Sequence, residues 1–307
     1  MKEVHIPRSL NQVWDLLDRE PGAMLYAGGT DLIPKVRKGL LSPPSLICLE
    51  RVRALKEVTD GGEEVFLGAG LTHHRVEALP SVQREFPLLA QAVGVLASPP
   101  IRHMGTMGGN IVTASPAGDT LPALTVLRAE VELVARERTR RMALADFIKG
   151  PGRTALEPGE ILRGLWIRKA SHFSVHHYEK VGRRKAQAIA VVSMAALLLM
   201  EGDIVKEARF AWGSAGPTVM TSRAVEEVFT GNPLSLEVLK RAALLAESAV
   251  KPIDDIRASA AYRREVAGRL LFRLLPGEIP SAGGEPGSLP LRGEPCPFLT
   301  DGASGLS

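Results

Sequence analysis

Two pairs of glycines stand where the backbone could approach a ligand closely. Gly28-Gly29 ends an apolar stretch, and Gly108-Gly109 lies in a second glycine-rich segment, residues 101–124. Glycine has no Cβ to intervene and adopts positive φ without steric cost. Successive N–H groups in such a turn can point into one concavity and hold a phosphate. The two pairs therefore indicate an anion-binding site, although a single pair is more often only a turn between a helix and a strand.

Short polar side chains follow the second pair and could contact a ligand. They are Asn110, Ser115 and Asp119. The Asp119 carboxylate could accept hydrogen bonds from ligand hydroxyls, or it could cap a helix or turn ahead of Leu121. The residue types leave both interpretations open.

The first unit expected to position these residues is a small α/β unit, residues 1–50. A helix is predicted over residues 10–17 after a candidate cap at Ser9, with strands at residues 23–27 and 45–49. A further helix over residues 31–38 would direct its positive N-terminal end at the first glycine pair, which suits a pyrophosphate.

Residues 51–170 form the second predicted unit. Strands are expected at residues 64–71, 130–135 and 160–167, and one helix at residues 81–97. The run Gly68-Ala69-Gly70 resembles the start of a dinucleotide-binding fingerprint. His73 stands where the third small residue should fall, so a Rossmann interpretation is rejected.

A third α+β unit is predicted over residues 171–276. Strands at residues 189–199 and 205–212 flank Glu201-Gly202-Asp203, a hairpin signal. Helices are expected at residues 222–230, 235–249 and 255–275. Residues 277–307 are rich in Pro, Gly and Ser and are predicted to be a flexible tail that contributes little to folding.

Composition excludes several classes of function. The 307 residues are 45% hydrophobic and 23% charged, with a formal net charge of +4. There is no dense basic run interleaved with aromatic residues, which argues against nucleic-acid binding. No apolar run is long enough to span a bilayer, and the N-terminus lacks the apolar core of a signal peptide. A cytoplasmic location is expected.

The two cysteines and the histidine pairs do not predict a metal centre. Cys48 lies in an apolar run and is expected to be buried, whereas Cys296 lies in the tail. Two cysteines indicate a reducing compartment and cannot ligate an iron–sulfur cluster, which takes about four ligands. The pairs His73-His74 and His176-His177 are interpreted as strand neighbours that point to opposite faces, so neither pair chelates a metal.

Six short motifs occur in a fixed order over residues 1 to about 275. They are AGGTDL (27–32), IRxxGTxGGN (101–110), SPAGD (115–119), EIL (160–162), YEKVGRR (178–184) and DIRASAAYRR (255–264). Together they resemble the FAD-binding medium subunit of molybdenum hydroxylases, the family of xanthine dehydrogenase and carbon monoxide dehydrogenase. The resemblance implies an α+β protein with a two-part vanillyl-alcohol-oxidase-type (PCMH-type) FAD-binding fold and a C-terminal α+β domain. His103 departs from the family, which usually has Asn there.

The resemblance also implies which residues contact FAD. Position by position they are Met24, Leu25, Tyr26, Ala27, Gly28, Gly29, Thr30, Asp31, Leu32, Leu96, Ala97, Thr106, Gly108, Gly109, Asn110, Val112, Gly118, Asp119, Leu162 and Lys180. Lys180 could place a positive charge near the flavin, where a cation raises the reduction potential. Alternatively, it is a solvated lysine in a basic run with Arg183, Arg184 and Lys185.

The implied function is electron transfer within a complex. A large partner with a molybdenum cofactor would hydroxylate the substrate, and a small partner with two [2Fe–2S] clusters would relay electrons. FAD in this subunit would pass them to NAD⁺, oxygen or another acceptor, within a dimer of heterotrimers. The molybdenum subunit would select the substrate, so this sequence does not name it. A self-contained flavin-dependent oxidoreductase and a scaffold that has lost FAD are the alternatives.

Overall fold

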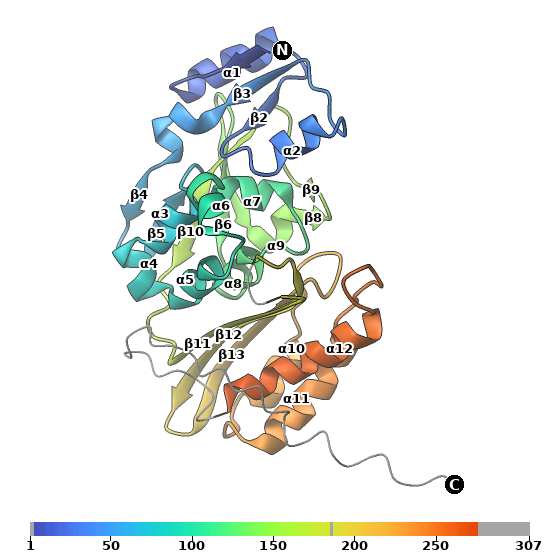
Figure 1. The fold of residues 1–307 in the computed structure, drawn as a ribbon. Helices are drawn as coiled ribbons and strands as arrows, with labels where there is room; N and C mark the ends of the chain where they lie inside the picture. Colours follow the sequence, from blue (N-terminus) through green and yellow to red (C-terminus); the bar gives the residue numbers. More distant parts are fainter. Residues whose placement is uncertain (1–2, 185–186, 276–307) are drawn as a thin grey trace, which may run out of the picture.

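Three main β-sheets follow one another along the chain in this computed structural model, which describes residues 3–184 and 187–275 (Figure 1). The sheet nearest the N-terminus lies at one end of the molecule, and the third sheet lies at the other end with the last helices. This arrangement confirms the predicted α+β class. The predicted tail, residues 277–307, lies outside the described residues, as does Cys296. No helix among the described residues is both long and apolar enough to cross a membrane.

The first sheet is parallel because helices connect its strands. Its strand order is β1 (Glu3–His5), β3 (Ser45–Cys48) and β2 (Met24–Tyr26). Helix α1 (Leu10–Arg19) begins at the predicted cap, where the Ser9 hydroxyl accepts the Gln12 N–H at 3.3 Å. Helix α2 (Leu32–Arg37) follows β2. Cys48 is buried, as predicted.

The second sheet is antiparallel and lies in the middle of the molecule. Its order is β4 (Val58–Asp60), β5 (Glu64–Gly68), β10 (Ile161–Arg168), β6 (Glu130–Val134) and β7 (Thr139–Ala143). The helices of this unit are α3 (His73–Glu77), α4 (Pro80–Glu85), α5 (Pro87–Gly94), α6 (Pro99–Met104), α7 (Met107–Thr113), α8 (Thr120–Val126) and α9 (Leu144–Phe147). Leu67 and Leu165 of the sheet share one core with Leu88 and Leu124 of the helices.

Short elements complete this unit. Two 3-10 turns, η1 (Leu49–Arg51) and η2 (Arg53–Leu55), lead from the first sheet to the second. A small hairpin of β8 (Ile148–Gly150) and β9 (Arg153–Thr154) follows α9. Leu49 and Leu55 of these turns and Gly152 of the hairpin border the same cavity.

The prediction of a single helix over residues 81–97 is wrong, because the helix is interrupted at Phe86. Pro87 has no N–H to donate, so it ends α4 and occupies the first turn of α5. Pro99 and Pro100 occupy the first turn of the short helix α6 in the same way.

The third sheet is a hairpin-connected antiparallel sheet that contributes to two cores. It contains β11 (Val175–Gly182), β12 (Ala190–Glu201) and β13 (Ile204–Gly213), and Gly202 takes positive φ in the predicted turn. Successive residues of a strand point to opposite faces. Met194 and Ala196 therefore join the C-terminal core, whereas Ala195 and Leu197 join the core of the second unit.

Helices cover the face of this sheet that carries Met194 and Ala196 (Figure 1). They are α10 (Arg223–Phe229), α11 (Leu236–Ala249), α12 (Ala260–Arg269) and the 3-10 turn η3 (Leu270–Leu274). The helix predicted from residue 255 begins later, at Ala260. The Asp255 carboxylate accepts the N–H of Arg257 at 2.8 Å, which favours a turn over a helix, and the Ser259 hydroxyl caps the helix instead.

Candidate functional site

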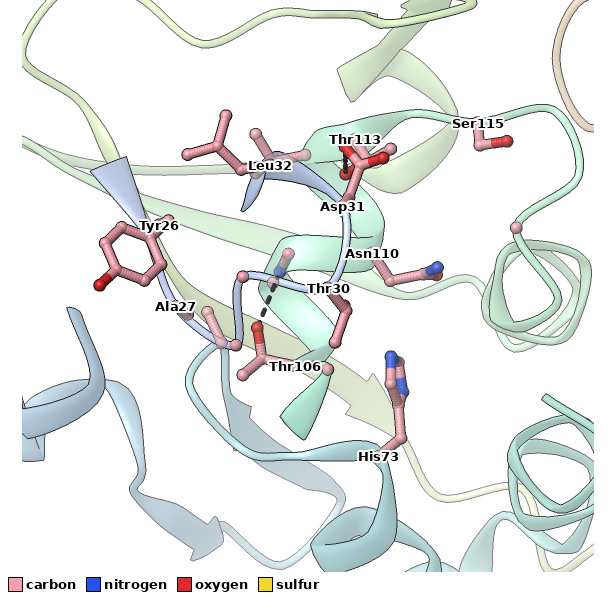
Figure 2. Close-up of a pocket in the computed structure, with 18 of the residues that line it drawn as sticks. Tyr26, Ala27, Thr30, Asp31, Leu32, His73, Thr106, Asn110, Thr113 and Ser115 are labelled. Carbon is pink, nitrogen blue, oxygen red and sulfur yellow. Dashed lines mark hydrogen bonds between the residues drawn. The ribbon is translucent and has the colours of Figure 1, made fainter. Parts of the chain in front are cut away.

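A cavity of about 760 Å³ opens where the loop after β2 meets α6 and α7 (Figure 2). Strand β10, the 115–119 segment and residues 187–189 complete its wall. Nineteen of the twenty residues predicted to contact a cofactor line this cavity; Lys180 does not, but its side chain binds one of them, Asp119. The structure therefore brings together segments that are far apart in the sequence.

The first glycine pair forms the predicted turn and leaves a row of amides free. Gly29 has φ +68°, a conformation that favours glycine. A Cβ on Gly28 would collide with the carbonyl oxygen of Met104, so this loop packs directly on the end of α6. Among the described residues, the N–H groups of residues 28–32 donate no hydrogen bond. This run of free donors can bind an anion.

The second glycine pair does not form the predicted turn: Gly108 and Gly109 lie in the first turn of α7. The Met107 and Gly108 N–H groups donate to the carbonyls of Leu71 and Ala69, at 3.0 and 2.8 Å. The Thr106 hydroxyl caps the Gly109 N–H at 3.1 Å. These amides already have protein partners, so this segment does not supply the anion cradle that the sequence suggested.

The glycines of α7 instead allow close packing and leave the cavity open. A Cβ on Gly108 would stand 2.6 Å from the Cβ of Ala69, next to β5. A Cβ on Gly109 would meet only the Thr106 hydroxyl, at 3.0 Å, and would otherwise enter the cavity. Gly108 is therefore required by the protein core, whereas Gly109 keeps space for a ligand.

Asp119 and Lys180 form a buried ion pair at the cavity. Lys180 Nζ lies 2.6 Å from Asp119 Oδ2 and also donates to the Val95 carbonyl at 3.1 Å. The Lys180 side chain is 7% exposed and that of Asp119 is 9% exposed, whereas Arg183 and Arg184 are exposed. The interpretation of Lys180 as a solvated lysine is therefore wrong.

The other oxygen of Asp119 is a candidate ligand contact. Asp119 precedes α8 but its side chain makes no capping hydrogen bond, so the alternative role as a cap is excluded. Its Oδ1 is buried and accepts no hydrogen bond from the part of the chain that the structure describes. Burial raises the pKa of the Asp119 carboxyl, and the Lys180 ammonium opposes that rise. A ligand hydroxyl at Oδ1 would satisfy an acceptor that the protein leaves unpaired.

Two other polar groups at the cavity are held by protein partners. The Asn110 side-chain oxygen accepts the Thr120 hydroxyl at 2.6 Å, which orients the amide. Glu160 lies in the wall, and Arg140 and Arg138 bind it; these partners lower the pKa of Glu160 to about 2. Asn110 can still contact a ligand through its amide nitrogen, whereas Glu160 is structural.

His73 is a lining residue that sequence reasoning missed. His73 and His74 lie on helix α3, not on a strand as predicted, and only His73 is buried. Its imidazole is 3% exposed and borders the cavity. Burial lowers the pKa of His73 to about 4, and Arg102 adds to that effect. The signal was its position just after Gly68-Ala69-Gly70, close to a glycine-rich segment.

The donor set of the cavity fits a flavin dinucleotide. Free amides at residues 28–32 suit a diphosphate, and the Asp119 and Asn110 side chains suit hydroxyl groups. Leu96 and Leu162 supply apolar wall for a flat ring system. The fold and the site together define a protein that binds a flavin dinucleotide without a Rossmann fold.

Comparison with known proteins agrees with this class. Residues 1–167 match the family model described as FAD binding domain in molybdopterin dehydrogenase. Residues 176–276 match the CO dehydrogenase flavoprotein C-terminal domain. The chain therefore belongs to the FAD-binding oxidoreductase subunits of the molybdenum hydroxylase family, and FAD is its cofactor.

Relatives and solved structures extend over most of the chain. The carbon monoxide dehydrogenase medium chain of Afipia carboxidovorans is 30% identical over 272 residues, covering 88% of this chain and 94% of that protein. The nicotinate dehydrogenase FAD-subunit of Eubacterium barkeri is 29% identical over 269 residues, covering 86% of this chain and 91% of that protein. Quinoline 2-oxidoreductase from Pseudomonas putida superposes with a TM-score of 0.85 at 27% identity, covering 89% of this chain and 95% of that chain.

Proposed function

We propose that this subunit receives electrons from [2Fe–2S] clusters of a small partner and delivers them, through FAD, to NAD⁺, oxygen or another acceptor. The observation that supports this most directly is one cavity that combines the free amides of residues 28–32 with the buried Asp119–Lys180 pair. The chain has two cysteines, and two [2Fe–2S] clusters need about eight ligands, so the clusters have to come from another chain.

Each part of the cavity has a role in this proposal. The loop of residues 28–32 binds the diphosphate, and Asp119 Oδ1 accepts a hydrogen bond from a ligand hydroxyl. Lys180 holds Asp119 in place and would supply positive charge close to the bound cofactor. Leu96 and Leu162 exclude water from the ring. Bound FAD supplies the redox chemistry, because it can accept and pass on electrons.

The names of relatives suggest the rest of the assembly. Several are medium chains or FAD-subunits of dehydrogenases, which implies companion subunits in those enzymes. For this chain we propose a large molybdenum-cofactor subunit and a small [2Fe–2S] subunit, assembled as a dimer of heterotrimers. The use of cysteine favours the cytoplasm as its location.

Reconstitution tests the electron-transfer role. The purified full chain should bind FAD, seen in its visible spectrum, but should oxidise no purine, aldehyde or carbon monoxide. Activity should appear only on co-expression with a cluster subunit and a molybdenum subunit. Turnover of such a substrate by the chain alone would favour the self-contained oxidoreductase, and failure to take up FAD would favour the scaffold.

Substitution of Gly109 tests the location of the site. Gly109→Val places a branched side chain in the cavity and should abolish FAD binding while the protein stays folded. Gly94→Val is a matched control, because Gly94 is an exposed glycine of α5 outside the cavity. Stoichiometric FAD in purified Gly109→Val would show that the cofactor binds elsewhere.

A further inference from the structure

The His73 imidazole is buried at the cavity and has no hydrogen-bond partner among the residues that the structure describes. Its Nδ1 is buried without a hydrogen bond, and no hydrogen bond is found for Nε2 within residues 3–184 and 187–275. Burial of an unpaired polar group costs free energy that a partner would recover. The proposed function uses Asp119 and Lys180 but leaves this side chain without a role.

The geometry places His73 beside the loop with the free amides. Its Cδ2 and the Thr30 hydroxyl oxygen each lie 3.3 Å from the point where a Cβ on Gly105 would stand. The His73 N–H donates to the Gly105 carbonyl at 2.9 Å, which fixes its backbone against this segment. Figure 2 shows the imidazole pointing toward Thr30 and Asn110. The absence of a side chain at Gly105 therefore lets His73 and Thr30 approach the same place.

The charge state of His73 suits binding to an anion. At neutral pH the imidazole is uncharged, so one ring nitrogen carries a hydrogen and donates. Arg102 is the nearby cation; it pairs with Glu77 at 3.5 Å and donates to the Leu96 carbonyl at 2.9 Å. Positive charge nearby disfavours protonation of His73 and favours an anion at the same place.

We propose that His73 is a cofactor-binding residue that donates a hydrogen bond from its imidazole to the diphosphate of bound FAD, next to the amides of residues 28–32. The inference rests on the proposed FAD site. It adds a side-chain donor to the backbone donors and gives the buried imidazole a partner that it lacks among the described residues.

The adjacent histidine provides a matched control. His74 is exposed and contacts His103 with ring centroids 3.8 Å apart, and it does not line the cavity. His73→Leu removes the donor and keeps an apolar side chain. His73→Gln restores an N–H donor at a similar reach. His74→Leu makes the same chemical change one residue away.

Competition binding with parts of the cofactor tests the assignment. Apo-protein would be titrated with FAD, with ADP, which contains the diphosphate, and with riboflavin and adenosine, which do not. His73→Leu should weaken both FAD and ADP by about tenfold to a hundredfold. Riboflavin and adenosine should bind as to the wild type. His73→Gln should recover most of the loss, His74→Leu should match the wild type, and ³¹P NMR of bound FAD should change only in the His73 variants.

The outcomes separate this inference from the proposed function. If the wild type binds FAD and His73→Leu binds FAD and ADP equally well, the His73 assignment is wrong while the FAD site stands. If His73→Leu weakens all four ligands alike and Gln does not rescue it, His73 has only a structural role and the assignment is again wrong. If the wild type binds no FAD, the proposed function and this inference both fail.

Discussion

Asp119 and Asp255 each form an ion pair of 2.6 Å with a buried cation, but the two carboxylates differ in what else they contact. Asp255 Oδ1 accepts from Arg263 Nη2 and from the N–H of Arg257, and its Oδ2 accepts from the Arg257 guanidinium. Asp119 has Lys180 on one oxygen, and the other oxygen has no partner within residues 3–184 and 187–275. The protein satisfies both oxygens of Asp255, whereas Asp119 keeps one acceptor for a ligand.

The pKa values of Asp255 and Asp119 shift in opposite directions, because the two carboxylates differ in how many hydrogen bonds they accept. Hydrogen bonds from Arg257 lower the pKa of Asp255, and they outweigh its partial burial. Burial raises the pKa of Asp119, because a single ammonium does not fully replace the water that the carboxylate has lost. An incompletely satisfied buried charge costs stability, and such groups gather at binding sites. This contrast separates a structural pair from a functional one.

The largest expected effect is on the structural pair. Arg263 is buried, and its guanidinium also donates to the carbonyls of Val191 and Ser214 at 2.9 and 3.0 Å. Arg263→Met would leave these carbonyls unpaired and should lower the free energy of unfolding by about 3 kcal/mol. Urea denaturation measures this, with the exposed neighbour Arg264→Met as the control. A variant as stable as the control would show that the pair is not structural.

Next in size is the effect of Asp119 on FAD. Asp119→Asn removes the charge from a hydrogen bond to the ligand and should weaken FAD by about 1.5–3 kcal/mol. Asp255→Asn is the matched control: it should lower stability but leave FAD affinity unchanged. Titration of the apo-proteins with FAD gives both values. Wild-type affinity in Asp119→Asn, or equal losses in the two variants, would remove the distinction between the pairs.

The sequence predicted only part of the fold and of the candidate site. Local signals identified most strands, the Ser9 cap and the Gly202 hairpin, because these depend on neighbouring residues. The motifs also indicated the residues that line the cavity. The burial of Lys180 could not be predicted from the sequence, because it depends on β11 lying beside Asp119. The two residues in contact are 61 positions apart in the chain.

Tertiary contacts also explain the remaining errors. Gly108-Gly109 looks like a turn in the sequence, but the Thr106 cap and the approach of Ala69 make it the start of a helix. His73 was assigned to a strand because helix α3 has only five residues and a weak pattern. The break at Pro87 was a local signal that could have been recognised.

A smaller effect is expected on the redox properties of the flavin. Lys180→Met removes a buried positive charge and leaves the Asp119 carboxylate without its cation, so the reduced, anionic flavin is less stabilised. The reduction potential should fall, measured by dye equilibration on the holo-protein. Arg183→Met, three residues further and exposed, should leave it unchanged. Equal potentials in the wild type and Lys180→Met would place Lys180 away from the flavin.

The smallest expected effect is on how stability depends on pH, and here the two carboxylates should differ in sign. Asp255 has a lowered pKa in the folded state, so its contribution is present above its ordinary value of about 3.9 and is lost as the pH falls. Asp119 in the apo-protein has a raised pKa, so its contribution to stability is present at low pH and is lost as the pH rises through the folded value.

Free energies of unfolding from urea titrations between about pH 3 and about pH 7 would be compared for the wild type, Asp119→Asn and Asp255→Asn. The advantage of wild type over Asp255→Asn should shrink toward acid, and its advantage over Asp119→Asn should shrink toward neutral pH. Slopes of the same sign would mean that Lys180 satisfies Asp119 as fully as the arginines satisfy Asp255, and the unpaired oxygen would then not mark a ligand contact.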